Sequence, residues 1–151
     1  MAASFISTVA GSLDSKGRVC IPAPFRDVLA EQGTAGVYIC PSYVRPTLEG
    51  FGEDAIRQIR ERQAPLDPFF SREHDVRATA VLARTQLLPR DENGRVRLPD
   101  ELIAHAGLKD CVTFVGLDRK FQIWDSERYR EVEAENLKRA IALFEAEGTT
   151  P

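Results

Sequence analysis

The sequence predicts a mixed α+β protein built from two tandem units, and three observations predict it. A ten-residue pattern occurs twice, as LDSKGRVCIP in Leu13–Pro22 and as RDENGRVRLP in Arg90–Pro99. Each copy is followed by a short segment with helical spacing of apolar residues and then by two β-type runs. A further helical segment closes each unit, and it is longer in the second. Because internal repetition marks repeated structural units, we expect repeats in 1–63 and 76–151, joined by a linker in 64–75.

The repeated pattern begins with a tight turn. Gly17 and Gly94 accept positive φ at little steric cost, so SKG and ENG are typical of turns between strands. Asp14 and Asp91 suit the first position of such a turn, because a carboxylate there can accept backbone N–H groups. Both copies therefore predict the same hairpin.

Each turn is followed by a strand in which aliphatic side chains alternate with polar or basic ones. Successive side chains of a strand leave by opposite faces. If the aliphatic residues face the core, Arg18, Arg95 and Arg97 point away from it. Pro22 and Pro99 then end the strands and allow a helix to begin just beyond them.

The remaining elements follow in the same order in both units. Short helices are predicted after each proline and end at Gly33 and Gly107. Two β-type runs follow in each unit, at 36–40 and 45–51 in the first and at 111–115 and 120–125 in the second. A helical segment then closes each unit, at 53–63 in the first and 126–147 in the second.

Composition limits the possible functions. The formal net charge of −3, taken over the whole chain, disfavours nucleic-acid binding. Charge is segregated along the chain, however: 76–97 carries five arginines against two acidic residues, which leaves room for a basic face. No apolar run approaches the roughly 20 residues that cross a bilayer, and the start lacks a secretory signal, so we expect a cytoplasmic protein without a membrane partner.

The three cysteines, Cys20, Cys40 and Cys111, lack metal-ligand spacing and are expected to be buried thiols on strands.

The motifs LDSKGRVCIPAPFR, the second DxxGRVxLP and VTFVGLDRKFQIWDSERY together resemble the MraZ family of bacterial transcriptional regulators, from about Phe5 to Tyr129. The resemblance implies an AbrB-like swapped-hairpin fold, doubled within one chain, with short helices and a longer C-terminal helix. It implies a homo-oligomer, such as a closed octameric ring, associated with the nucleoid. Such a ring would bind double-stranded DNA at short direct repeats in the promoter upstream of the division and cell-wall gene cluster and repress it.

The family's DNA-contacting motif is DxxxR, and this sequence carries it in both repeats. Asn93 stands in the second copy where the first has Lys16, and we expect Arg97 to supply the missing charge, with Arg90 as a weaker candidate. The expected DNA-contacting residues are Lys16, Arg18, Arg95 and Arg97. The residues expected to form the turns and orient the arginines are Asp14, Gly17, Asp91 and Gly94.

Two other classes of function compete with a DNA-binding regulator. An enzyme is disfavoured, because no GxGxxG, P-loop, HExxH or GxSxG motif is present and neither His74 nor His105 has a partner at a catalytic spacing. We therefore expect no catalytic residue, metal, cofactor or small-molecule substrate. The alternative is a ring-forming protein-interaction scaffold without sequence-specific DNA binding. A third interpretation keeps DNA binding but makes it architectural, without sequence choice.

Overall fold

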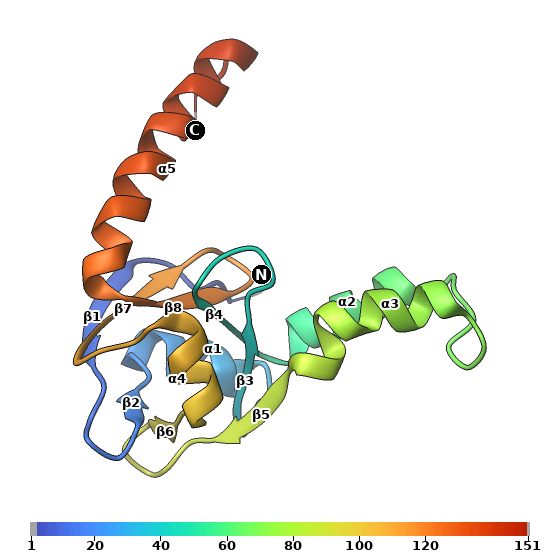
Figure 1. The fold of residues 1–151 in the computed structure, drawn as a ribbon, viewed down its shortest axis with the longest axis horizontal. Coiled ribbons are helices and arrows are strands. Elements are labelled where there is room, and N and C mark those ends of the chain that lie inside the picture. Colours follow the sequence, from blue (N-terminus) through green and yellow to red (C-terminus); the bar gives the residue numbers. More distant parts are fainter. Residues whose placement is uncertain (1–2, 151) are drawn as a thin grey trace.

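A computed structural model describes residues 3–150, which form eight strands, five α-helices and one 3-10 helix (Figure 1). The first half of the chain contains β1 (Thr8–Ser12), β2 (Arg18–Cys20), α1 (Ala23–Glu31), β3 (Gly36–Pro41), β4 (Leu48–Phe51) and α2 (Glu53–Gln63). The second half contains α3 (Arg72–Ala80), η1 (Leu82–Arg84), β5 (Gln86–Pro89), β6 (Arg95–Arg97), α4 (Asp100–Ala106), β7 (Cys111–Gly116), β8 (Phe121–Asp125) and α5 (Ser126–Glu147). The predicted α+β class with a longer C-terminal helix is confirmed.

Strands from both halves join in one six-stranded antiparallel sheet. Its order is β1-β7-β8-β4-β3-β5. The edge strand β1 pairs with β7 of the second half, and the other edge strand, β5, pairs with β3 of the first. At the centre, β4 pairs with β8. Each half therefore contributes an edge strand that pairs with a strand of the other half, and the strand order has pseudo-twofold symmetry. The division into repeats at 1–63 and 76–151, with a linker at 64–75, stays a prediction.

A separate two-stranded ribbon repeats this exchange. Strand β2 of the first half pairs with β6 of the second, antiparallel, with Val19 opposite Val96 at its centre. The bonds at its two ends also match, since Leu98 N donates to Gly17 O (2.8 Å) and Ile21 N donates to Gly94 O (2.9 Å). The ribbon lies at the lower end of the body in Figure 1.

The core lies between this ribbon and the sheet. Helices α1 and α4 begin directly after Pro22 and Pro99, as predicted, and the backbone turns left-handed at Gly33 (φ 75°) and Gly107 (φ 59°) just beyond them. One apolar cluster joins the inner faces of ribbon, helices and sheet; it includes Val19, Ile21, Phe25, Leu29, Val96, Leu98, Leu102, Val112, Phe114 and Phe121. Aliphatic burial thus fixes which face of the ribbon is exposed.

Two helical projections leave this body (Figure 1). Helix α5 begins at Ser126 and is capped by Asp125, whose carboxylate accepts Arg128 N; only Val132 on the helix is buried. Helices α2 and α3 form an arm, and α3 was not predicted: it begins at Arg72, inside the expected linker, with Ser71 Oγ accepting His74 N (3.1 Å) as its cap. No helix among residues 3–150 is long and apolar enough to cross a membrane.

Candidate nucleic-acid interface

The exposed face of the ribbon gathers the arginines. Directly opposed residues of an antiparallel pair point to the same face. Arg18 lies opposite Arg97, and Cys20 lies opposite Arg95. Because Val19 (1% exposed) and Val96 (0% exposed) occupy the buried face, these four residues, Arg18, Cys20, Arg95 and Arg97, share the outer one, which we term the arginine face.

Turn 1, residues Asp14–Arg18, is closed by its own aspartate. Asp14 Oδ1 accepts the backbone N–H groups of Lys16 and Arg18, each at 2.9 Å. Gly17 N donates to Asp14 O (3.0 Å). Gly17 has a φ of 77°, the left-handed region in which a Cβ is strained, so glycine is required there.

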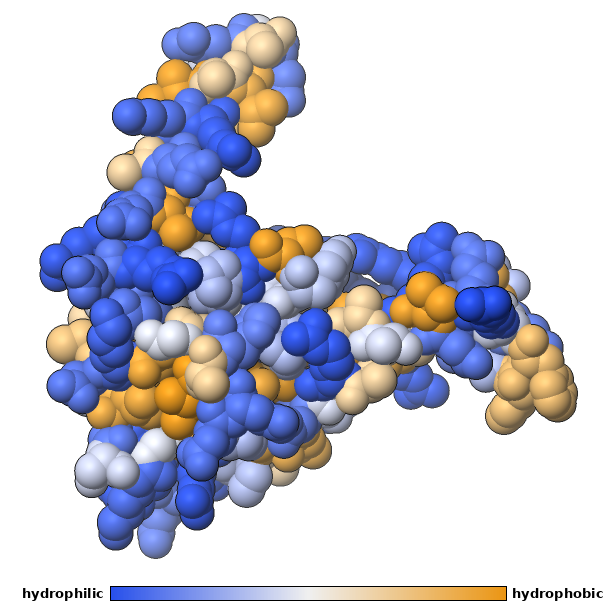
Figure 2. Space-filling model, viewed as in Figure 1, coloured by the Kyte–Doolittle hydropathy of each residue, from blue (hydrophilic) through white to orange (hydrophobic). Residues whose placement is uncertain are grey.

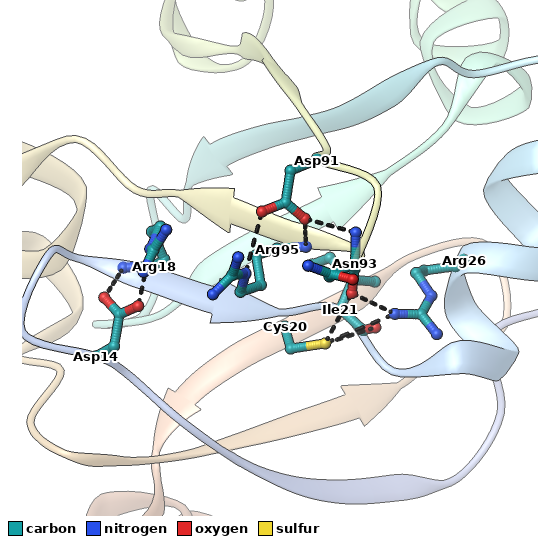
Figure 3. Close-up of polar contacts among 8 residues, drawn as sticks. All are labelled: Asp14, Arg18, Cys20, Ile21, Arg26, Asp91, Asn93 and Arg95. Atoms are coloured by element: carbon teal, nitrogen blue, oxygen red, sulfur yellow. Dashed lines mark hydrogen bonds and ion pairs between the residues drawn. The ribbon is translucent and has the colours of Figure 1, made fainter.

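Turn 2, residues Asp91–Arg95, has nearly the same geometry (Figure 3). Asp91 Oδ1 accepts from Asn93 N (2.9 Å) and Arg95 N (2.8 Å). Gly94 has a φ of 78° and donates to Asp91 O (2.9 Å). One sequence pattern therefore produces the same local structure twice.

Each aspartate also positions the arginine that ends its turn. Arg18 Nε donates to Asp14 Oδ2 (2.8 Å), and Arg95 Nε donates to Asp91 Oδ2 (3.0 Å) (Figure 3). Between Ala3 and Thr150, no hydrogen bond occupies the terminal nitrogens of Arg18 or Arg95. An exposed ion pair adds little stability, so its main effect here is to hold the guanidinium with its two-nitrogen end free.

The expected cations are not equally placed. Arg97 is exposed on the arginine face, and Lys16 is exposed in turn 1. Asn93 is exposed at the position in turn 2 that matches Lys16. Arg90 instead donates to the carbonyls of Thr34 (3.2 Å) and Gly36 (2.5 Å), so it stabilises the segment between α1 and β3. Its desolvation, and next the positive charge of Arg26, lower the pKa of Arg90.

Two features of this surface were missed from the sequence. The expectation that all three cysteines are buried is wrong for Cys20 and Cys111, which are exposed; only Cys40 is buried. Cys20 lies on the arginine face because it is the next residue in the strand after the buried Val19, so its side chain leaves by the opposite face. Arg26 of α1 contacts Cys20 and Asn93 at the same end of the ribbon. The spacing of apolar residues in α1 predicts the helix but not these contacts.

The turn carboxylates give the two turns a pH dependence. The backbone hydrogen bond from Arg18 lowers the pKa of Asp14 below its usual 3.8, and that from Arg95 does the same for Asp91. A carboxylate whose folded-state pKa is lowered contributes stability above its unfolded pKa, and the contribution is lost as pH falls through the folded value. We expect carboxyl-carbon NMR titrations to place both midpoints below 3.8, and Arg18→Gln to raise that of Asp14 alone. Midpoints at or above 3.8 would contradict the observed hydrogen bonds.

Residues 3–150 contain no group of three or more His, Cys, Asp or Glu side chains placed to hold a metal ion. The chemistry available at the arginine face is instead that of hydrogen-bond donation by fixed cations, which suits phosphate oxygens and guanine edges.

Comparison with known proteins identifies a family model and several relatives that this chain resembles. The sequence model of the family described as "MraZ protein, putative antitoxin-like" matches residues 81–147. The chain is 41% identical over 145 residues to the transcriptional regulator MraZ of Xanthobacter autotrophicus, covering 96% of this chain and 92% of that protein. It is 42% identical to the transcriptional regulator MraZ of Gluconacetobacter diazotrophicus, covering 92% of this chain and 90% of that one.

Proposed function

The chain belongs to the MraZ family of transcriptional regulators, and from this we propose that it represses transcription by binding promoter DNA through its arginine face. The observation that carries the proposal is the register of β2 and β6, which gathers Arg18, Arg95 and Arg97 on one exposed face. A two-stranded ribbon fits the major groove of B-form DNA. We therefore propose that the β2–β6 ribbon enters that groove.

The roles of individual residues follow from the turns. Arg18 and Arg95, fixed through Nε, would donate from their terminal nitrogens to guanine O6 and N7 or to phosphate. Lys16 and Arg97 would approach neighbouring phosphates. Asp14 and Asp91, with the glycines of the two turns, would hold this geometry before DNA arrives, which reduces the ordering cost of binding.

A like-charge contact supports a functional origin for this face. Arg18 and Arg97 lie directly opposite each other in the ribbon. Like charges at such positions destabilise an antiparallel pair. Since the turn needs only the aspartate and the glycine, this pair of arginines disfavours the fold and is best explained by an external anion.

Oligomerisation would supply the affinity that one ribbon lacks. We propose that the chain forms a homo-oligomeric closed ring, such as an octamer, whose ribbons engage successive direct repeats upstream of the division and cell-wall genes. After one ribbon binds, the effective concentration of the next one multiplies the overall affinity. The surface is compatible with this separation of tasks: the lower end of the body is mainly hydrophilic, while apolar patches occur on α5, on the arm and on the body above that end (Figure 2). Such a regulator is a binding protein of the cytoplasm and nucleoid rather than an enzyme.

Binding of DNA by the unmodified chain is the first test. We expect fluorescence anisotropy to show retention of a duplex taken from upstream of the gene that encodes the chain, in preference to a scrambled duplex of equal length. The slope of log affinity against log salt concentration should have a magnitude of at least about 3, since each neutralised phosphate contributes about 0.9. Light scattering with and without the duplex should show one closed assembly.

The other outcomes separate the competing functions. Equal affinity for both duplexes would indicate architectural binding without sequence choice. No retention even at low salt would instead support the protein-interaction scaffold, because phosphate contacts are strongest under that condition.

A further inference from the structure

The two turns have the same backbone conformation, but only turn 1 has a lysine two residues after its aspartate. Lys16 in turn 1 corresponds to Asn93 in turn 2, since each donates its N–H to the turn aspartate at 2.9 Å. Opposite Arg95, the first half contributes Cys20, whereas opposite Arg18 the second contributes Arg97. Most cations of the arginine face and the two turns therefore lie at the turn 1 end of the ribbon, which carries Lys16, Arg18 and Arg97. Turn 2 contributes Arg95 alone.

The residues that cover the two turns also differ: an apolar side chain covers turn 1, which has the lysine, and a cationic side chain covers turn 2, which lacks it. Ile103 of α4 covers turn 1, where a Cβ at Gly17 would lie 3.4 Å from Ile103 Cδ1. Arg26 of α1 covers turn 2, and a Cβ at Gly94 would overlap its side chain. Arg26 and Ile103 occupy matching positions, each four residues after the proline that precedes its helix. A charged residue thus stands beside the turn that lacks the lysine.

The contacts of Arg26 place its charge at this end of the ribbon. Its Nη1 donates to Asn93 O (3.0 Å) and lies 3.6 Å from Cys20 Sγ on the arginine face (Figure 3). No carboxylate in the described range 3–150 forms an ion pair with Arg26. Its positive charge also lowers the pKa of Arg90 nearby. Arg26 is therefore a partly exposed cation with a like-charged neighbour, which is the setting in which an added anion is stabilising.

We propose that Arg26 is a further DNA-contacting residue, which supplies at turn 2 the phosphate contact that Lys16 supplies at turn 1. The inference rests on the proposed function of the arginine face. It revises the expectation that Arg97, or more weakly Arg90, supplies the charge that Asn93 lacks. Arg97 lies across from Arg18, at the other end of the ribbon, and Arg90 donates to the carbonyls of Thr34 and Gly36. With Arg26 included, both ends of the ribbon hold a cation beside the turn and an arginine within it.

The test compares the full-length chain with Arg26→Gln and Arg26→Ile, using the upstream duplex and the scrambled duplex as probes. Gln keeps a donor for Asn93 O without the charge, and Ile reproduces the residue found at the matching position over turn 1. We expect both variants to bind each duplex about tenfold more weakly and to reduce the magnitude of the salt slope by about one for each ribbon engaged. Arg130→Gln, which removes an exposed cation from α5, is the matched control and should leave affinity and slope unchanged.

A rescue variant distinguishes charge from a role in shaping the turn. Arg26→Gln combined with Asn93→Lys restores a cation at turn 2 in the form present at turn 1, so affinity and slope should return toward the original values. Unchanged binding in Arg26→Gln would overturn the inference while leaving the proposed function intact. Weaker binding with an unchanged slope and no rescue would also overturn it, because Arg26 would then only shape the turn. If the unmodified chain retains neither duplex, the proposed function fails and the inference fails with it.

Discussion

Replacing Arg18 by alanine is expected to lower the affinity of each ribbon for the upstream duplex about fivefold to 150-fold, since one bidentate arginine–guanine contact is worth about 1–3 kcal/mol. Arg18 is the best-placed candidate because Asp14 fixes its Nε at 2.8 Å and its side chain is 30% exposed. In a ring the loss is repeated in every subunit, so operator binding should be abolished at working concentrations. Anisotropy titration with both duplexes measures the effect.

The fold should tolerate this change. Arg18 lies opposite Arg97, so alanine removes a like-charge contact from the ribbon, and we expect an unchanged or slightly higher melting temperature with the assembly size preserved. Arg77→Ala is the matched control, because Arg77 is an exposed arginine of the arm that also pairs with a carboxylate four residues earlier, Glu73. Equal affinity of the Arg18 and Arg77 variants for the upstream duplex would refute the role of Arg18.

Local patterns determined much of this site in advance. The aspartate and the glycine of each turn predict a tight turn with a left-handed glycine, which the structure has. Strand alternation then places Arg18, Arg95 and Arg97 on the exposed face. These features depend on neighbouring residues only, and so the repeated ten residues were enough to predict them. Their contact with DNA remains a prediction.

The partners of the strands were beyond the reach of such patterns. A three-residue strand such as β2 can pair equally well with several others, and only the common core selects β6 from the other half. The contact of Arg26 with Asn93 follows from that choice, which explains why it was missed. The exposure of Cys20 follows instead from its place next to the buried Val19 in the same strand. Helix α3 was missed for another reason: none of its residues is buried, so it has no apolar stripe to reveal it.

The shared core leads to the second large effect, on stability. Phe121 is fully buried and belongs to the second half, yet its ring centroid lies 5.1 Å from those of both Phe5 and Phe25 in the first. It also covers Gly50, where a side chain would collide with the ring. Phe121→Ala should therefore reduce the free energy of unfolding by about 3–5 kcal/mol, the usual cost of removing a buried aromatic ring.

The form of the unfolding curve is as informative as its midpoint. Because one residue supports packing in both halves, urea denaturation should remain a single transition whose midpoint falls, rather than separating into one transition for 1–63 and one for 76–151. Phe70→Ala removes the same ring from the arm, where Phe70 is 91% exposed, and should change the stability by no more than about 0.5 kcal/mol. Two resolved transitions in the Phe121 variant would mean that the repeats fold independently. The arginines of the ribbon would then lack a common scaffold, since β2 and β6 come from different halves and reach one face only when both halves fold together.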